Sequence, residues 1–162
     1  MIPVLRLGGR TDLAGLEREC RRPELGNPRA FPAGSEQPLT PFGARLFGEG
    51  SMSISANNLK LTAVGLDPGK PGLYFQGNNR VAGGSGVHFG DGLRCAGGGV
   101  IRLQVRMASD TGESQTTASI STIGGVQPGD VKRYQIWYRD PNTSPCGGLF
   151  NLSNGMEVTW SA

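Results

Sequence analysis

The sequence is poor in the residues that most often build metal centres, catalytic sites and membrane spans. It has one histidine and three cysteines among 162 residues, and no Cys-x-x-Cys pair, which argues against a zinc site. No stretch approaches the roughly 20 consecutive apolar residues that a transmembrane helix needs. Hydrophobic residues make up only 36% of the chain, so its core must be thin.

The charge is too weakly organised for a protein that binds nucleic acid. Lysine and arginine total 16 against 13 acidic residues, and they are dispersed among the acids. Nucleic-acid binders usually concentrate their basic residues on one face or one element. We therefore expect no nucleic-acid partner and no segment that spans a membrane.

Glycine, in contrast, is abundant, with 27 residues, and proline adds 11. These residues stand between short runs of β-branched and aromatic residues, as turn residues do in an all-β domain. The length is that of one ordinary domain with or without a tail.

Residues 1–41 differ from the rest and are expected to form a loosely ordered tail before a domain at 42–162. They contain six arginines and no lysine, unlike the rest of the chain. Within them, 11–22 predicts a short helix with Asp12 as its N-cap. The segment 24–40 is typical of a Pro-rich linker.

From Phe42 onward, apolar and polar residues alternate, which predicts strands with one buried face. In 100–106, for example, Ile101, Leu103 and Val105 share one face of the strand. The other segments with this pattern are 44–47, 52–54, 59–64, 73–76, 115–123, 131–138 and 156–160. About eight strands with turn signals between them predict an antiparallel β-sandwich, jelly-roll or immunoglobulin-like, with no helix after residue 41.

Five segments together resemble a family of C-terminal domains found in large secreted proteins of planctomycetes and related bacteria. The segments are Ser55–Leu61, Gly72–Gly77, Phe89–Gly98, Gln135–Pro141 and Phe150–Trp160. They follow the order of the family and span roughly two thirds of the chain. The resemblance implies a β-rich extracellular accessory module, attached to other domains and without enzymatic activity.

The location that this resemblance implies is secreted or cell-surface. The first residues lack the charged start and long apolar middle of a signal peptide. A start inside a longer reading frame, or a frameshift upstream, would explain that lack.

Cys95 and Cys146 each follow a turn-like segment and each enter a glycine-rich stretch. In an exported protein we predict a disulfide between them, which would close a loop of about 50 residues and stabilise the fold by on the order of 3–4 kcal/mol. The alternative is a pair of buried, unbridged cysteines. Cys20 is left over as a free or intermolecular thiol.

His88, with Ser85 and Asp91 close by in the sequence, raises the alternative of a hydrolase. The members of a catalytic triad normally come from separate segments of the chain. Ser85, His88 and Asp91 are each three residues apart in one glycine-rich loop, so they are not expected to form a triad. We interpret His88 as a surface loop residue. The glycines at 83–86 and 97–99 lack the helix start and Lys-Ser/Thr of a phosphate-binding loop and indicate turns.

Aspartates stand in five of the predicted turns, where they commonly cap the turn through their own backbone. They are Asp67, Asp91, Asp110, Asp130 and Asp140. No Asp-x-Asp-x-Asp spacing is present, so a calcium site would have to be assembled by the fold. We expect no cofactor and keep calcium as the alternative.

Trp137 and Arg139, with Tyr138 between them, are the candidate ligand-binding residues. Trp137 shares a strand face with Gln135 and Arg139, and an exposed tryptophan in such polar company is a platform for a sugar ring. The alternative is that Trp137 packs in the core, as mid-strand tryptophans of sandwiches commonly do.

Together with the extracellular, non-enzymatic character that the family resemblance implies, these patterns predict a non-catalytic accessory or surface-interaction module, structural or adhesive in role. Its partner would be a surface, a glycan or a protein. The alternatives are a carbohydrate-binding module, which needs an exposed aromatic side chain near polar loops, and a hydrolase with a site near His88.

Overall fold

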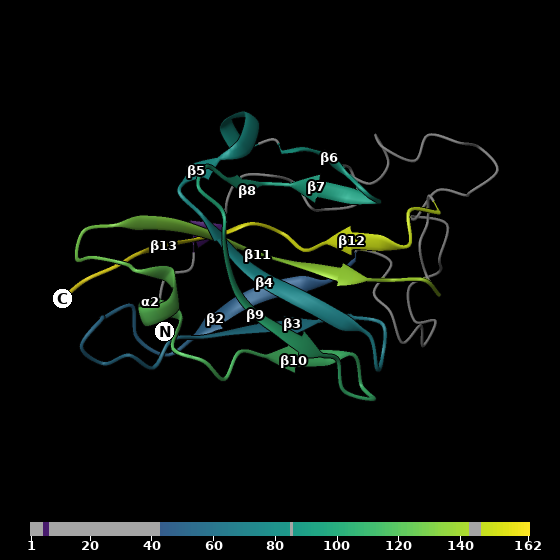
Figure 1. Cartoon of the computed structure of the whole chain (residues 1–162), viewed down its shortest axis with the longest axis horizontal. Helices are drawn as coiled ribbons and strands as arrows, with labels where there is room; N and C mark the ends of the chain where they lie inside the picture. The colour runs from purple at the N-terminus through teal and green to yellow at the C-terminus, as the bar shows by residue number, and fades with distance from the viewer. Residues whose placement is uncertain (1–4, 7–42, 85, 143–146) are drawn as a thin grey trace.

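The computed structural model describes residues 5–6, 43–84, 86–142 and 147–162, which fold mostly into antiparallel strands (Figure 1). The largest sheet has six strands in the order β1-β13-β11-β4-β9, with β12 also paired to β11. These strands are β1 (Leu5–Arg6), β4 (Pro71–Gly77), β9 (Ile101–Met107), β11 (Val131–Arg139), β12 (Phe150–Leu152) and β13 (Met156–Thr159). This architecture agrees with the all-β class predicted from the sequence.

A second sheet has three strands in the order β10-β3-β2. Its members are β2 (Arg45–Glu49), β3 (Lys60–Val64) and β10 (Glu113–Gln115). All its pairings are antiparallel.

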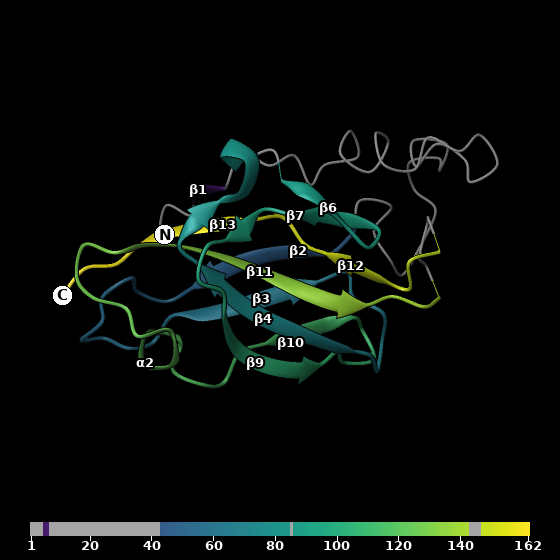
Figure 2. The same ribbon diagram turned by 45° about the horizontal axis from the view of Figure 1, so that its top comes forward.

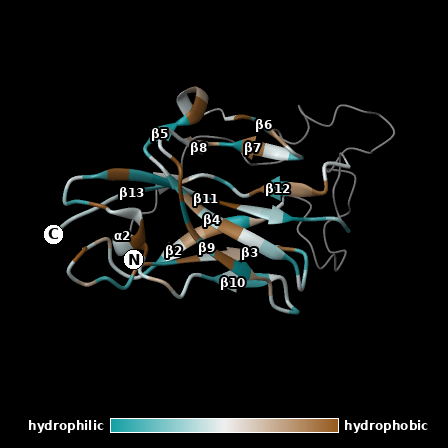
Figure 3. Ribbon diagram, viewed as in Figure 1, coloured by the Kyte–Doolittle hydropathy of each residue, from teal (hydrophilic) through white to brown (hydrophobic). Residues whose placement is uncertain are grey.

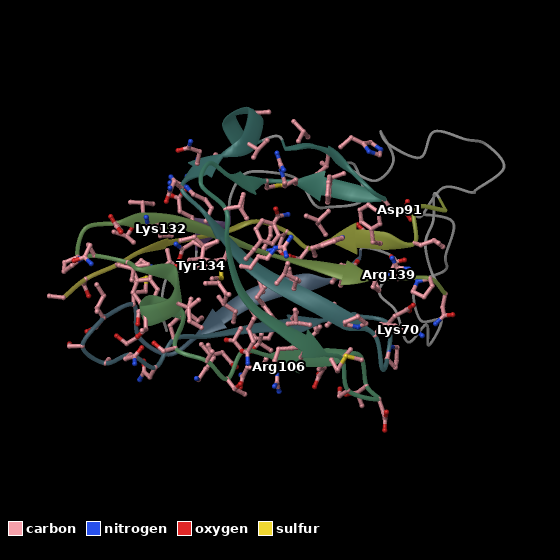
Figure 4. All side chains as sticks on the ribbon, in the orientation of Figure 1. Lys70, Asp91, Arg106, Lys132, Tyr134 and Arg139 are labelled. Carbon is pink, nitrogen blue, oxygen red and sulfur yellow. The ribbon has the colours of Figure 1, made fainter. Side chains whose placement is uncertain are left out.

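The main hydrophobic core joins the six-stranded sheet to the three-stranded sheet. From β11 it takes Tyr134, Ile136 and Tyr138, which alternate with residues pointing the other way, as the pleat of a strand requires. From β3 it takes Leu61 and Ala63. We call the face of the six-stranded sheet that bears Tyr134 its inner face and the opposite face its outer face; Figure 4 shows Tyr134 in the middle of the molecule.

Four short strands form a further layer, which we call the outer layer. β5 (Asn79–Arg80) pairs with β8 (Ala96–Gly97), and β6 (Val87–Phe89) pairs with β7 (Gly92–Arg94). Figures 1 and 2 both show these strands gathered on one side of the molecule. A second, smaller cluster of buried side chains joins them to the outer face and contains Phe75, Ala96 and Leu152, with Trp137 packed against it.

The prediction of no helix after residue 41, with a strand over 115–123, is wrong. The described chain leaves β10 at Gln115 and forms a short helix, α2 (Ile120–Gly124). The side chain of Ser119 caps its start by accepting a hydrogen bond from the backbone N–H of Thr122, and Gly125 ends it with a left-handed φ of 58°. These two caps are the sequence signal that outweighs the alternation.

Other differences concern short elements. The described residues contain thirteen strands rather than about eight, because short pairs form around the glycines. The segment 52–54 contributes only an isolated bridge between Ser53 and Ser161, and Val81–Gly84 forms a 3-10 segment, η3. Within the described ranges, no helix is long and apolar enough to cross a membrane.

The N-terminal tail contributes one edge strand. Leu5 and Arg6 form β1, which pairs with Glu157 and Met156 of β13. The helix expected over 11–22 and the linker expected over 24–40 lie outside the described residues.

In β9 a register shift against β4 interrupts the alternation of the two faces. Leu103 lies in the main core, but Val105 is exposed and lies opposite Leu73, so the prediction that Val105 shares a face with Ile101 and Leu103 is wrong. Arg102 is exposed as well. Figure 3 lets the reader follow the change between hydrophobic and hydrophilic residues along this strand. The exposed apolar residues of β9 belong to the surface described next.

Candidate functional site

Three aromatic side chains from three elements meet on the outer face, and we call them the aromatic cluster. They are Trp137 from β11, Phe150 from β12 and Phe89 from β6. The ring centroids lie 6.1 Å apart for Phe89 and Trp137, 5.4 Å for Phe89 and Phe150, and 5.7 Å for Trp137 and Phe150, all edge to face. This is an attractive arrangement for aromatic quadrupoles, so the cluster holds the β6–β7 hairpin against the sheet.

Apolar side chains extend the aromatic cluster across the sheet. Leu73 of β4 lies directly opposite Trp137, and Val105 of β9 lies directly opposite Leu73, so all three share the outer face. Val105 is 61% exposed and Met107 58% exposed. We call the aromatic cluster together with Leu73, Val105 and Met107 the outer surface.

Three arginines surround the outer surface. The guanidinium carbon of Arg94 lies 5.9 Å from the centroid of the Phe89 ring, within range of a cation–π contact. Arg139 lies directly opposite Phe150 on the neighbouring strand, and Arg102 is exposed on β9.

None of these three arginines takes part in an ion pair within the part of the chain that the structure describes. By contrast, Arg80 and Arg133 each place Nε 2.8 Å from Oε2 of Glu157. Glu157 therefore has its pKa held below the usual range, first by the hydrogen bond from Arg80. The cations of the outer surface thus have no internal partner of this kind.

Gln135 positions the hairpin that carries Phe89 and Arg94. Its Oε1 accepts hydrogen bonds from the N–H of Cys95 at 2.7 Å and of Ala96 at 3.0 Å. Its Nε2 donates to the carbonyls of Leu93 at 2.9 Å and Ser153 at 2.7 Å. All four bonding positions of this fully buried amide are filled, so Gln135 ties β7 and β8 to the six-stranded sheet.

Glycines allow the outer layer to approach the sheet closely. A Cβ on Gly77 of β4 would collide with the backbone of Gly97 in β8. At the hairpin turn, Gly90 has a φ of +62°, and a Cβ there would strike the ring of Phe150. The turn can therefore lie directly on the aromatic cluster only because it has no side chain at Gly90.

The structure separates the three candidate ligand-binding residues. Trp137 is half-buried in the aromatic cluster and Arg139 is exposed, both on the outer face. Tyr138 lies on the inner face, 3% exposed, where its hydroxyl accepts a hydrogen bond from the N–H of Ala44 at 3.0 Å. Tyr138 is therefore a core residue and is not part of the outer surface.

Sequence reasoning missed Phe89, Phe150 and Arg94 as members of this surface. Phe89 and Arg94 lie on the two strands of a hairpin whose two-residue turn, Gly90-Asp91, lies between the paired residues Phe89 and Gly92. A glycine-flanked aspartate between apolar residues is a recognised hairpin signal, and it would have placed both residues on one hairpin. No local signal joins either of them to Phe150.

Three of the five turn aspartates gather near one end of the sheet, beside Tyr138. Asp67 accepts a hydrogen bond from the N–H of Asn142 at 3.1 Å, and Asp91 accepts one from the N–H of Gly148 at 2.8 Å. Asp140 accepts one from the amide of Asn151 at 3.4 Å. All three side chains are buried, so they hold loops to the end of the sheet.

No set of three or more His, Cys, Asp or Glu side chains in the described ranges is arranged to hold a metal ion. Asp130 lies apart, 3.3 Å from Nζ of Lys132, and Asp110 is exposed in the turn after β9.

Asp140 is the most perturbed carboxyl group of the three. Its pKa is raised to about 7, first by burial and also by the nearby charges of Asp91 and Asp67, against the hydrogen bond from Asn151, which lowers it. Its Oδ1 atom is buried without a hydrogen-bond partner. The carboxyl group of Asp140 therefore holds a proton well above the pH at which an exposed aspartate loses one.

The remaining predicted residues lie on the outer layer. His88 is exposed on β6, and no hydrogen bond or ion pair of its side chain occurs among the described residues. Cys95 is fully buried, with Sγ 3.6 Å from the carbonyl oxygen of Leu93. Cys146 lies outside the described residues, so the Cys95–Cys146 disulfide stays a prediction.

No protein-family model, no curated protein and no solved structure matches this chain. Function is therefore argued from the residues of the outer surface.

Proposed function

We propose that this chain is a non-catalytic, extracellular surface-interaction module that binds its partner through the outer surface. One observation carries the proposal: three aromatic side chains and the exposed Val105 and Met107 share a face that the main core does not use. Contiguous exposed apolar side chains rimmed by charged ones mark interaction sites on soluble proteins. An adhesive or structural role needs such a face.

The proposal includes an antiparallel sandwich built from the six-stranded and three-stranded sheets. It is supported by the packing of Tyr134 and Ile136 of β11 with Leu61 and Ala63 of β3 in one core. A sandwich leaves the outer face free to carry a binding layer. Export, by secretion or to the cell surface, accords with the predicted disulfide between Cys95 and Cys146.

A carbohydrate-binding module is the second candidate, favoured by Phe89. This ring is 39% exposed and lies beside the guanidinium of Arg94. Aromatic rings next to hydrogen-bond donors are the usual means of holding sugars, because C–H groups stack on the ring while hydroxyl groups are bonded at its edge.

A binding assay with surface variants tests the proposal. The full chain is incubated with insoluble cellulose, chitin and peptidoglycan, and with soluble polysaccharides in affinity electrophoresis, and bound protein is measured. Phe89→Ser and Val105→Ser remove apolar area from the outer surface. Phe47→Ser is the matched control, because Phe47 is 37% exposed on β2, in the other sheet.

We expect binding to at least one ligand that Phe89→Ser and Val105→Ser weaken at least tenfold and that Phe47→Ser leaves within twofold. Equal weakening by all three variants, or binding that none of them changes, would show that the outer surface is not the binding site. Thermal unfolding of each variant confirms that it is folded.

A further inference from the structure

The unpaired arginines of the outer surface point to the chemistry of its partner, on the premise that the proposed function is right. Arg94, Arg102 and Arg139 have no ion pair within the described chain, although Arg80, Lys132 and Arg133 all have one. Cations without an internal partner on a binding face are complementary to a negatively charged ligand.

Two acidic side chains near the three arginines do not offer them a free charge. Asp140 follows Arg139 in the chain and is buried beside Asn151, the cross-strand partner of Tyr138, on the inner side of the sheet. Glu157 lies on the outer face opposite Arg133, but its carboxylate is paired with Arg80 and Arg133. The outer surface therefore presents positive charge beside apolar area.

The backbone groups between β4, β9 and β11 are used in the sheet ladders, so an extended peptide cannot pair with the middle of this face. Strand addition would be confined to the outer edge of β9, the last strand of the described sheet. A chain of sugar rings needs no backbone pairing, because it can lie on Phe89, Val105 and Met107 through its C–H faces.

We infer that the outer surface binds an acidic polysaccharide, with sugar rings on Phe89 and Val105 and their carboxylates on Arg94, Arg102 and Arg139. The ligand class is a polymer of uronic-acid type, in which each ring carries an apolar face and a carboxylate. Guanidinium groups bind carboxylates with two parallel hydrogen bonds.

Affinity electrophoresis of the full chain tests this inference with three probes, which are polygalacturonate, dextran and poly-glutamate. Arg102→Gln and Arg139→Gln are the main variants, because both side chains are exposed. Arg94→Gln is added with a check of thermal unfolding, since it removes the contact with Phe89. Arg45→Gln, exposed on β2, is the matched control.

Polygalacturonate is expected to retard the chain, and dextran is not. Arg102→Gln and Arg139→Gln should each weaken binding by about three- to tenfold, as the loss of one charge-assisted contact does, and Arg45→Gln by less than twofold. Raising the salt from 50 to 500 mM should weaken binding strongly because exposed charges are screened.

Other results overturn the inference. Equal retardation by poly-glutamate with the same arginine dependence would assign the surface to acidic proteins. Binding to a neutral polysaccharide that depends on Phe89 but on no arginine would refute the acidic ligand and leave the proposed function standing. Binding that neither Phe89→Ser nor any arginine variant alters would refute both.

Discussion

The indole N–H of Trp160 donates a hydrogen bond to the hydroxyl of Tyr134 at 2.9 Å, in the centre of the main core. That hydroxyl donates in turn to Oε1 of Gln76 at 2.9 Å, and Nε2 of Gln76 donates to the carbonyl of Gly124 at 3.0 Å. This chain of bonds links the residue that follows β13 to β11, β4 and α2. It is a buried polar network in which each group depends on its neighbours.

Tyr134→Phe is expected to destabilise the fold by about 2 kcal/mol, because it leaves the Trp160 N–H and the Gln76 oxygen without a partner. The free energy of unfolding in urea, followed by tryptophan fluorescence, measures this. A loss below about 0.5 kcal/mol would mean that water replaces the hydroxyl and that the network is not closed.

Asp140→Asn should remove the part of the pH dependence of stability that the Asp140 carboxyl group causes. The folded chain keeps the Asp140 proton up to a pKa of about 7, whereas the group has a usual value of 3.8. The stability that this proton contributes is complete below about pH 4 and is lost as the pH rises through 7. The difference in melting temperature, variant minus parent, should rise between pH 4.5 and pH 8.

The variant and the parent chain share all other carboxyl groups, so the contributions of those groups to the pH dependence of stability cancel in the difference. Glu157 and Asp130 have lowered pKa values, held down first by Arg80 and by the N–H of Gln127 respectively, so their contributions are lost only at more acidic pH. Asp110→Asn, at an exposed turn position, is the control. A flat difference for Asp140→Asn would rule out a buried, protonated carboxyl group.

Gly77→Ala should separate the outer layer from the sheet. A methyl group at Gly77 meets the backbone of Gly97, which cannot move aside as a flexible side chain would. We expect a loss of about 1–3 kcal/mol, as in overpacked cores. Gly48→Ala is the control in thermal unfolding, because its methyl group would be 3.4 Å from Leu59 and Met156; equal melting temperatures for the two variants would contradict the close crossing.

Gln135→Glu tests the tie between the outer layer and β11. A carboxylate there turns two donors into acceptors facing the carbonyls of Leu93 and Ser153. We expect a loss of at least about 2 kcal/mol and faster hydrogen exchange in β6 and β7.

Gln104→Glu is the matched variant for this test, because Oε1 of Gln104 also accepts from two N–H groups, at Thr117 and Ala118, but at a more exposed site. Its loss should stay below about 1 kcal/mol. Similar losses for both variants would show that burial at Gln135 is unimportant.

The predicted disulfide between Cys95 and Cys146 can be tested by thiol labelling and intact mass. Protein from an oxidising compartment should take up one label, at Cys20, when unfolded without reductant, and three with it. Reduction should cost about 3–4 kcal/mol for a loop of about 50 residues. Three labels without reductant would disprove the bridge.

Alternation in the sequence located the long strands because each of them has one face on the main core. β3, β4, β9, β11 and β13 all overlap segments predicted from a period of two. The short strands β6, β7, β8 and β12 were not predicted, because a run of two or three residues next to glycine is too short to show an alternation of apolar and polar residues. The helix α2 was not predicted because its sequence signal lies in its capping residues, Ser119 and Gly125, rather than in the spacing of its apolar residues.

The candidate site was only half predictable for a related reason. Trp137 and Arg139 lie two residues apart on one strand, so their shared face follows from the pleat. Phe89 and Phe150 contact Trp137 through tertiary packing, and local sequence patterns do not predict contacts between segments distant in the chain. Asp140 shows the same limit, because its raised pKa arises from burial and from Asp67 and Asp91, which are distant in the chain.

β4 and β9 are antiparallel neighbours in the sheet, yet the whole outer layer lies between them in the chain. A tight turn would suffice to join two such strands. Residues 78–100 are thus an enlarged hairpin loop that has acquired its own strands and folded back over the sheet. Lengthening a surface loop costs little free energy, so this loop could be exchanged for another at its two ends, giving the same scaffold a different binding preference.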